Sequence, residues 1–239
     1  MYLGGAVNST TGVHFSSISK GESLPDTIRV ISHYCDIIVL RHFQEGAAKE
    51  AAEFASVPII NAGDGIGEHP TQALLDLFTI YEEKKRLNNL TVVFTGDLRF
   101  GRTVHSLVKL LSLYDDIRFV FVAPEIIQLP ADLVQVLKIK GLSVELTDDH
   151  DNAIKDADVI YCTRVQKERF VSVSEFESVA RLFHLNRQKV ESLCKSDVSI
   201  LHPLPRVTEL NEDVDELPNA TYFSQSQNGL FIRMALFLK

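Results

Sequence analysis

Basic side chains follow several apolar segments of this sequence, each at the point where the segment ends. Arginine presents a planar fork that binds a carboxylate or a phosphate through two parallel hydrogen bonds. We therefore expect these stretches to form a site for a small ligand with several negative oxygens. For any single arginine, the alternative is a solvated loop residue or a local salt-bridge partner. The stretches are Arg41-His42, His69-Pro70-Thr71-Gln72, Gly96 to Thr103, Thr163-Arg164-Val165-Gln166-Lys167-Glu168-Arg169 and His202-Pro203-Leu204-Pro205-Arg206.

The apolar segments are predicted to be buried strands that alternate with helices. Their apolar residues do not alternate with polar ones, which is typical of a parallel sheet covered by helices on both faces. Ligands of such open α/β sheets bind at the carboxyl ends of the strands, where the basic stretches stand. The predicted fold class is therefore α/β with doubly wound parallel sheets. Strands are predicted at residues 36–40, 57–60, 91–95, 119–122, 144–146, 159–162 and 198–201, and helices at 45–55, 71–86, 104–111, 132–140 and 231–238.

The order of these elements predicts two α/β units rather than one. The long helix at 71–86 is followed by Leu87-Asn88-Asn89-Leu90, after which a second series of strands and helices begins. The last helix follows Gln227-Asn228-Gly229 and could return to the first unit. We therefore predict a first domain at residues 1–69, completed by residues 228–239, and a second domain at residues 70–227.

Composition excludes several classes of protein. The 239 residues are 45% hydrophobic and 23% charged, as in ordinary globular proteins, and the net charge of −8 argues against a nucleic-acid partner. No apolar run approaches the roughly 20 residues that span a bilayer, and the N-terminus does not resemble a secretion signal. Cys35, Cys162 and Cys194 lack the spacing of metal ligands. They are predicted to be reduced thiols of a cytoplasmic protein, without a metal or a disulfide.

The stretch from Gly96 to Thr103 is close to a nucleotide-binding P-loop. It fits G-x-x-x-x-G followed by a basic residue and threonine, at a turn from a strand into a helix. However, Arg102 stands where a P-loop requires lysine, and no second strand supplies an obvious aspartate for magnesium. The Rossmann pattern G-x-G-x-x-G is also absent. Nucleotide binding is therefore not favoured.

Taken together, the basic stretches resemble the motifs of the catalytic chains of aspartate carbamoyltransferases, in the order and at the spacing of that family. The resemblance extends over essentially all 239 residues. It implies the carbamoyltransferase fold, in which a carbamoyl phosphate domain precedes an aspartate domain and a C-terminal helix returns to the first. It also implies transfer of a carbamoyl group from carbamoyl phosphate to the amino group of L-aspartate, in pyrimidine biosynthesis, without a metal or an organic cofactor.

The resemblance assigns roles to residues of this chain. Arg41 and His69 would hydrogen-bond the carbonyl oxygen of carbamoyl phosphate and stabilise the oxyanion that develops during attack by the amine. Gln72 and the backbone carbonyls of Leu204 and Pro205 would hold the carbamoyl NH2 group and the incoming amine. Positioning of both substrates would supply much of the remaining rate enhancement.

A second set of residues is implied to bind aspartate or to act between subunits. Arg102, Arg164 and Gln166 would bind the two carboxylates of aspartate. Ser16 and Lys20 match a loop that reaches into the active site of a neighbouring subunit, with Lys20 in a catalytic role. The resemblance therefore implies a homotrimer with shared active sites, which a separate regulatory subunit can accompany.

Ornithine carbamoyltransferase is the alternative within the wider group. That enzyme typically has His-Pro-Cys-Gln and a Cys-Leu-Pro near the last strand, whereas this chain has His69-Pro70-Thr71-Gln72 and His202-Pro203-Leu204-Pro205-Arg206. Arginines directed at a dicarboxylate also suit aspartate better than a cationic side chain. The sequence therefore favours aspartate.

One departure from the family pattern opens a second alternative. Members of the family have a Ser-Thr-Arg-Thr stretch that binds the phosphate, and nothing in residues 1–15 of this chain replaces it; Ser9-Thr10-Thr11 lacks the arginine. On this basis the first domain is expected to lack its first strand and helix. The alternative function is that of a catalytically silent paralogue, which binds ligands or other subunits.

Overall fold

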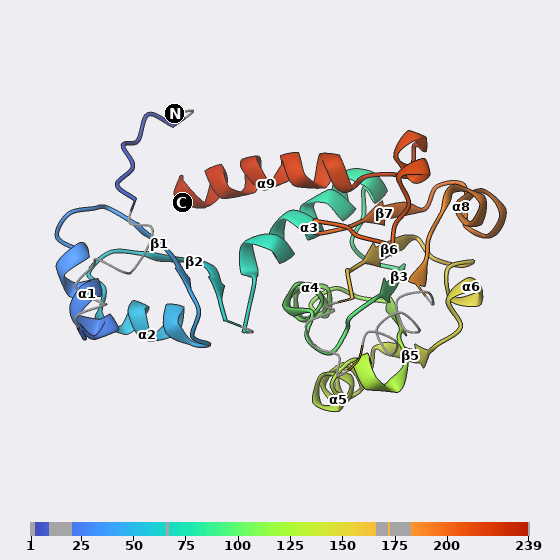
Figure 1. Ribbon diagram of the computed structural model, residues 1–239, viewed down its shortest axis with the longest axis horizontal. Helices are drawn as coiled ribbons and strands as arrows, with labels where there is room; N and C mark the ends of the chain where they lie inside the picture. Colours follow the sequence, from blue (N-terminus) through green and yellow to red (C-terminus); the bar gives the residue numbers. More distant parts are fainter. Residues whose placement is uncertain (1–2, 10–20, 66, 166–171, 173–182, 239) are drawn as a thin grey trace. The chain divides into compact units, whose positions relative to one another are not determined.

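The computed structural model of the protein describes residues 3–9, 21–65, 67–165, 172 and 183–238 (Figure 1). The chain divides into two compact units, of which the first comprises Met1–Thr71 with Met234–Lys239 and the second comprises Gln72–Arg233. The strands of both units are parallel, so the predicted α/β class with parallel sheets is confirmed.

The described residues of the first unit form two parallel strands and two helices. Its elements are α1 (Leu24–Ile31), β1 (Ile38–His42), α2 (Ala47–Phe54) and β2 (Ile59–Asp64). Ile28, Ile38 and Ala51 form a small core between them. Each helix begins after a residue that suits the N-cap position. Ser23 caps α1 by accepting a hydrogen bond from the amide of Asp26, and Gly46 precedes α2 with φ at 82°.

Both strands of this unit lie further along the chain than predicted. Arg41 and His42 were expected to follow the first strand, but they form its last residues. The reason is the pairing with β2, which runs from Ile38 opposite Ile59 to His42 opposite Asp64, with an irregularity after Leu40. Backbone hydrogen bonds therefore extend the strand into polar residues, which hydrophobicity alone does not predict to be part of a strand.

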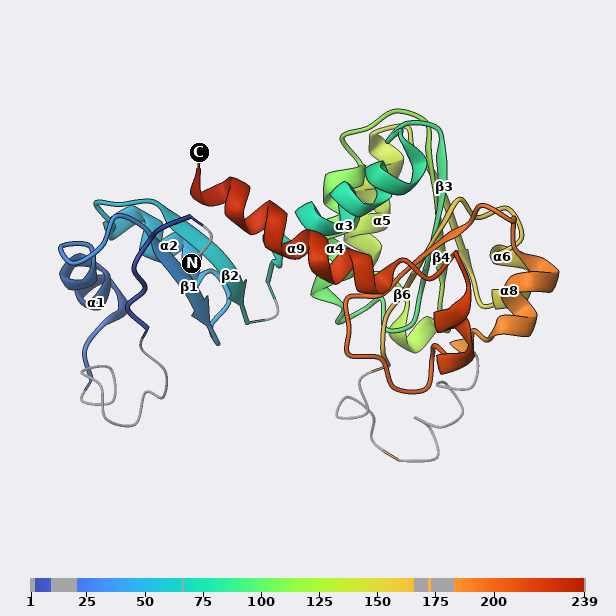
Figure 2. The ribbon, with the colours of Figure 1, turned by 90° about the horizontal axis from the view of Figure 1, so that it is seen from above.

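The second unit is built on a five-stranded parallel sheet in the order β5-β4-β3-β6-β7. In Figures 1 and 2, α4 and α5 lie on one side of this sheet, and α6 and α8 lie on the other. This doubly wound arrangement is the one that the sequence predicts for continuous apolar strands. Its strands are β3 (Leu90–Thr95), β4 (Ile117–Val122), β5 (Ser143–Thr147), β6 (Val159–Cys162) and β7 (Ser199–Leu201). Its helices are α4 (Arg102–Leu111), α5 (Ala131–Ile139), α6 (His150–Ala153) and α8 (Arg187–Leu193), with 3-10 turns η3 (Glu125–Ile127) and η6 (Glu212–Glu216). Most of α3 (Pro70–Lys84) and of α9 (Tyr222–Phe237) also belongs to this unit, whereas the first two residues of α3 and the last four of α9 are assigned to the first.

Aromatic rings fill the centre of this unit. Phe94 of β3 lies with its ring centroid 5.4 Å from that of Phe121 and 5.6 Å from that of Tyr161, and all three side chains are fully buried. Offset ring pairs at such distances add to the free energy gained by burial. The rings come from β3, β4 and β6, so they join the three central strands of the sheet.

Helix α9 begins earlier than the sequence suggests. Gln227-Asn228-Gly229 was expected to precede the last helix, but it lies inside α9. Figures 1 and 2 show α9 beside α3, and Asn228 donates a hydrogen bond to Thr79 of α3 at 3.0 Å. A β-carbon at Gly229 would lie 3.1 Å from a methyl group of Leu75. The glycine therefore allows close packing of two helices instead of starting one.

The carboxyl ends of β3 and β6 approach each other closely at Gly96. The amide of Thr163 donates a hydrogen bond to the carbonyl of Thr95 at 2.8 Å. Gly96 has φ at +112°, and a β-carbon there would lie 2.0 Å from the carbonyl oxygen of Thr163. Only glycine can occupy this position. The segments that carry Arg102 and Arg164 therefore leave the sheet from adjoining points.

This crowding predicts a large effect of Gly96→Ala on stability. We expect the substitution to lower the free energy of unfolding in urea by more than about 3 kcal/mol, because both the backbone angle and the neighbouring carbonyl oppose a side chain. Gly141→Ala is the matched control, since Gly141 has φ at +75° with nothing within 4 Å. It should lose only about 1–2 kcal/mol. Equal losses in the two variants would contradict the close approach of the strands.

Candidate active site

The structure places five of the predicted site residues in the second unit. Gln72 lies in the first turn of α3, Arg102 is the first residue of α4, and Arg164 follows β6. Leu204 and Pro205 follow β7. Because β3, β6 and β7 are adjacent and parallel, the segments after them leave the same edge of the sheet. The sequence therefore brings Arg102, Arg164 and the loop after β7 to one edge.

Two of the other predicted residues belong to the first unit, and three are not among the residues that the structure describes. Arg41 belongs to β1 of the first unit, where it is exposed, and His69 immediately precedes α3 and is half-buried. Ser16, Lys20 and Gln166 lie outside the described residues. Their roles stay predictions.

The turn that delivers Arg102 is held by backbone contacts. A β-carbon at Gly101 would lie 2.4 Å from the carbonyl oxygen of Asp97, so glycine is needed there as well. The ring Nε2 of His105 lies 2.8 Å from the carbonyl oxygen of Leu98, which ties the first turn of α4 to the loop. Gly101, the residue at the N-cap of α4, makes no side-chain hydrogen bond to the helix. The positive end of the helix dipole accompanies Arg102 and suits an anionic group.

The loop after β7 is anchored by a buried pair, His202 and Glu209. His202 Nε2 lies 2.7 Å from Glu209 Oε1, and His202 Nδ1 accepts a hydrogen bond from the amide of Leu204 at 2.8 Å. The proton of the neutral ring is therefore assigned to Nε2, which donates to the carboxylate. Glu209 also accepts hydrogen bonds from the amides of Val207 and Thr208, each at 3.1 Å. The carbonyls of Leu204 and Pro205 are thus presented by a well-anchored loop.

The environment of Glu209 keeps its side chain ionised. Burial raises the pKa of this carboxyl, but hydrogen bonds from His202 and from backbone amides lower it by more. The net pKa lies below the usual 4.5. An ionised Glu209 can only accept hydrogen bonds, and all the groups described around it donate.

Arg206, the last residue of the same loop, is already engaged. Its guanidinium makes two hydrogen bonds to Asp215, one of them Nη2 to Oδ2 at 2.7 Å, and it also contacts the hydroxyl of Tyr222. The guanidinium lowers the pKa of Asp215. Of the basic residues at strand ends, Arg206 therefore fits the alternative of a local salt bridge.

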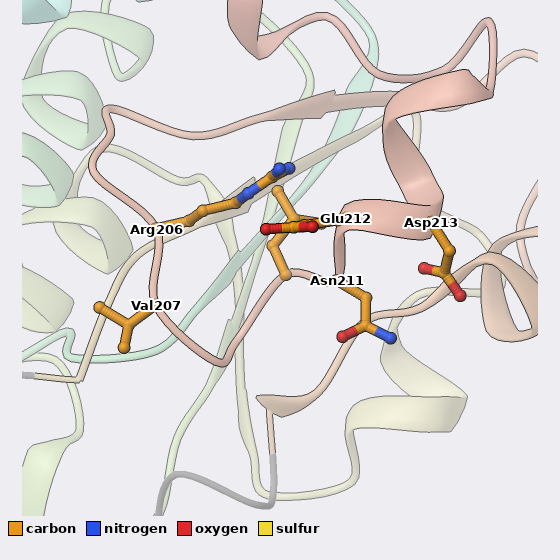
Figure 3. A pocket seen from close by; sticks show the side chains of 6 residues that line it. Arg206, Val207, Asn211, Glu212 and Asp213 are labelled. Carbon is orange, nitrogen blue, oxygen red and sulfur yellow. The ribbon is translucent and has the colours of Figure 1, made fainter.

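A pocket of about 350 Å³ lies beside Arg206 but does not include the predicted site residues (Figure 3). Glu212 and Asp213 stand on its wall, so its charge does not suit an anionic substrate. The geometry at the strand ends is the better guide to the active site. The pocket is lined by Arg206, Val207, Leu210, Asn211, Glu212 and Asp213.

Sequence reasoning missed a buried carboxylate behind Gln72. Asp76 lies one turn further along α3 and accepts three hydrogen bonds, from Gln72 Nε2 at 2.7 Å, the Tyr161 hydroxyl at 2.7 Å and Gln225 Nε2 at 2.6 Å. Burial raises its pKa to about 7, and these hydrogen bonds, with the charge of Arg233, only partly offset that rise. The spacing of Gln72 and Asp76 on one helix was a visible signal. The partners on β6 and α9 were not.

The described residues hold no group of three or more histidine, cysteine or acidic side chains placed to bind a metal ion. Cys35, Cys162 and Cys194 are free thiols, and burial raises the pKa of Cys194 to about 11. No helix in the described part of the chain is long and apolar enough to cross a membrane.

Comparison with known proteins identifies close relatives. Two family models match, the carbamoyl-P binding domain of aspartate/ornithine carbamoyltransferase at residues 1–82 and the Asp/Orn binding domain at residues 88–239. The aspartate carbamoyltransferase catalytic subunit of Methanocaldococcus jannaschii is 50% identical over 237 residues, which are 99% of this chain and 76% of that protein.

Solved structures agree with this. A structure of the M. jannaschii catalytic subunit of aspartate transcarbamoylase superposes with a TM-score of 0.91 at 49% identity, covering 98% of this chain and 76% of that one. Aspartate transcarbamoylase from Trypanosoma cruzi, in complex with N-(phosphonacetyl)-L-aspartic acid, gives a TM-score of 0.88 at 41% identity over 96% of this chain and 73% of that one.

The contacts of Glu209 predict a specific loss in Glu209→Gln. A carboxamide has one acceptor oxygen for three donors and adds an NH2 group, so we expect unfolding in urea at pH 7 to become easier by about 2–3 kcal/mol. The native pKa of Glu209 is lowered, so its stabilising effect is present above the ordinary value of 4.5 and is lost as the pH falls through the lowered value. The deficit of the variant should therefore shrink below pH 4.5.

The control for this prediction is Glu212→Gln, which changes an exposed carboxylate in η6. It should alter stability by less than about 0.5 kcal/mol at either pH. A deficit of Glu209→Gln that stays constant from pH 7 to pH 3 would show that the charge of Glu209 plays no part.

Proposed function

The chain belongs to the aspartate/ornithine carbamoyltransferase family, and from this premise we propose how it transfers the carbamoyl group of carbamoyl phosphate to the amino group of L-aspartate. The products are N-carbamoyl-L-aspartate and phosphate, and the reaction belongs to pyrimidine biosynthesis. The observation that carries this function is the near-50% identity, over almost the whole chain, with proteins named aspartate carbamoyltransferase catalytic subunit. Such relatives do not favour a silent paralogue.

Aspartate, rather than ornithine, is the acceptor that the second unit suits. The segments after β3 and β6 carry Arg102 and Arg164, and they leave the sheet from adjoining points. Two arginines match the two carboxylates of aspartate, each through paired charge-assisted hydrogen bonds. The cationic side chain of ornithine would be repelled there. Gln166 is the third group that we assign to the acceptor.

The amine of the acceptor and the NH2 group of carbamoyl phosphate need hydrogen-bond acceptors. We assign these to Gln72 and to the backbone carbonyls of Leu204 and Pro205. The anchoring of the β7 loop by His202 and Glu209 supports this assignment, because a carbonyl fixed in advance loses little entropy when it binds. In this arrangement the arginines hold the acidic end of the acceptor and the carbonyls orient its amine.

The carbonyl oxygen of carbamoyl phosphate becomes negative as the amine attacks. We assign its stabilisation to Arg41 and His69 of the first unit. Donors that are placed before the reaction stabilise such an oxyanion more than water does, because they need no reorganisation. Loss of phosphate then leaves the carbamoylated amine.

Ser16 and Lys20 are proposed to complete the site from a neighbouring subunit. This makes a homotrimer with shared active sites part of the mechanism, and the name catalytic subunit among the relatives is compatible with an accompanying regulatory chain. The free thiols of Cys35, Cys162 and Cys194 support our proposal that the protein works in the cytoplasm.

A transfer assay with the purified chain tests this function. We expect product from carbamoyl phosphate with L-aspartate, and none with L-ornithine. Arg164→Gln should raise the KM for aspartate by at least about tenfold, because one charge-assisted contact is lost, while the dissociation constant of carbamoyl phosphate stays unchanged. Arg118→Gln is the control, since Arg118 pairs with Glu145 on the surface at 2.7 Å, and it should leave both constants unchanged.

The other outcomes distinguish the alternatives. Transfer to ornithine would overturn the choice of acceptor. Binding of the dicarboxylate succinate by calorimetry, without any transfer, would support a silent paralogue. An unchanged KM in Arg164→Gln, with normal transfer, would remove Arg164 from the acceptor site.

A further inference from the structure

We propose that Asp76 is a positioning residue, whose carboxylate orients the side-chain amide of Gln72 so that the amide oxygen faces the reacting groups. This inference rests on the function proposed above, in which Gln72 binds substrate N–H groups. Asp76 itself is fully buried and acts through Gln72. It lies four residues after Gln72, which places both side chains on the same side of α3.

The orientation follows from the chemistry of the two groups. A glutamine amide has a donating NH2 end and an accepting oxygen end, and its hydrogen-bond partners decide which way it points. A carboxylate can only accept. Gln72 Nε2 therefore has to face Asp76 Oδ1, at 2.7 Å, and its oxygen is left at the opposite end. The half-buried Gln72 cannot turn over without placing two oxygens against each other.

Asp76 is itself held in place from two other elements. The Tyr161 hydroxyl of β6 donates to Oδ2 at 2.7 Å, and Gln225 Nε2 of α9 donates to Oδ1 at 2.6 Å. Tyr161 is fully buried and Gln225 is 1% exposed, so water does not replace either hydrogen bond to the carboxylate. With donors on both oxygens, the carboxylate cannot rotate away from Gln72.

The same network reaches the other proposed acceptors of hydrogen bonds. The oxygen of Gln225 accepts from the backbone amide of His202 at 2.9 Å, so this amide is fixed at both ends. His202 begins the loop that carries Leu204 and Pro205. One buried carboxylate thus connects the orientation of Gln72 with the base of the β7 loop, and all three proposed acceptors would face the same N–H groups.

The contact with Gln72 does not depend on which protonation state of Asp76 is present. The groups that face the carboxyl are Gln72 from its own helix, Tyr161 from β6, and Gln225 and Arg233 from α9. Burial raises the pKa of Asp76 to about 7, so part of the protein carries a proton there at neutral pH. Both glutamines donate to Oδ1, whereas Oδ2 faces only the Tyr161 hydroxyl, so a proton on Oδ2 would leave the contact with Gln72 in place.

A double-mutant cycle tests the inference. Asp76→Ala should lower kcat for transfer to aspartate by about ten- to a hundredfold, with the KM for aspartate changed less than about threefold, because the misoriented amide fails mainly in the transition state. In a Gln72→Ala background, Asp76→Ala should cause no further loss. A purely structural role would instead give losses that multiply in the double variant, and that result would overturn the inference.

Asp76→Asn separates hydrogen bonding from charge. Its oxygen can still accept from Gln72 and Gln225, while its NH2 group donates to the Tyr161 oxygen. We expect kcat to stay within about threefold of the unchanged chain. A loss above about tenfold would show that the charge of Asp76, rather than its acceptor, matters. This variant decides the question if Asp76→Ala fails to fold.

Thr79→Val is the matched control. Thr79 is buried one turn further along α3 and receives a hydrogen bond from Asn228 of α9, so the variant removes a similar contact between the same helices without touching Gln72. It should lower stability, yet change kcat less than about twofold. A fall in kcat equal to that of Asp76→Ala would assign the effect to helix packing.

A measurement that does not need turnover keeps this inference separate from the proposed function. In protein labelled with ¹⁵N at glutamine, the side-chain NH2 signal of Gln72, assigned by its loss in Gln72→Ala, should lie apart from those of exposed glutamines. It should move to the exposed position in Asp76→Ala but not in Thr79→Val. If this is seen and the chain transfers nothing, the function fails and the contact stands. If the chain transfers normally and the signal does not move, the positioning role is wrong.

Discussion

The second unit depends on how closely β3 and β6 approach at their carboxyl ends. The chain leaves β3 through α4 toward β4 on one side, and it later returns to place β6 against the other edge of β3. The segments after these two strands therefore start next to each other and then diverge, which is the position where open α/β sheets bind ligands. Gly96 makes the approach close enough for Thr163 to bond to Thr95.

Two buried carboxylates support the polar groups at this edge, and they differ in their chemistry. Glu209 accepts hydrogen bonds from two backbone amides and one histidine, and its pKa is lowered. Asp76 is fully buried and receives only side-chain donors, and its pKa rises to about 7. In both cases burial penalises the ionised form and three groups donate hydrogen bonds to it, so the balance between the depth of burial and the kind of donor decides the direction of the shift. Glu209 therefore stabilises the fold at pH values above its pKa. Ionised Asp76 costs stability because it is buried, and in our proposal its function is to orient Gln72.

The sequence predicted the second unit better than the first. The expected strand at 159–162 coincides with β6, and that at 91–95 lies within β3, because both strands are mostly apolar and buried on both faces. In the first unit, β1 continues through Arg41 and His42, since pairing with β2 and not hydrophobicity sets its end. Asp76 could not be interpreted from sequence, because its partners Tyr161 and Gln225 lie 85 and 149 residues away. The order of the motifs in the sequence predicted the class of reaction, but it did not predict the side-chain contacts that position the motif residues.

The basic stretches look alike in the sequence, but the structure shows that Arg206 has an acidic partner on its own chain. Arg206 is paired in a bidentate manner with Asp215, so it could bind a substrate carboxylate only by giving up that partner. In the function that we propose, the loop after β7 supplies carbonyl oxygens, and the segments after β3 and β6 supply Arg102 and Arg164. A ligand at this edge would meet cations from the middle of the sheet and hydrogen-bond acceptors from its β7 side. An amino acid with two carboxylates and an amine can use both the cations and the hydrogen-bond acceptors. A ligand with phosphates alone has no N–H group to donate to these acceptors. On this assignment, the placement of charge along the sheet edge suits aspartate better than the nucleotide that the P-loop-like stretch from Gly96 to Thr103 would bind.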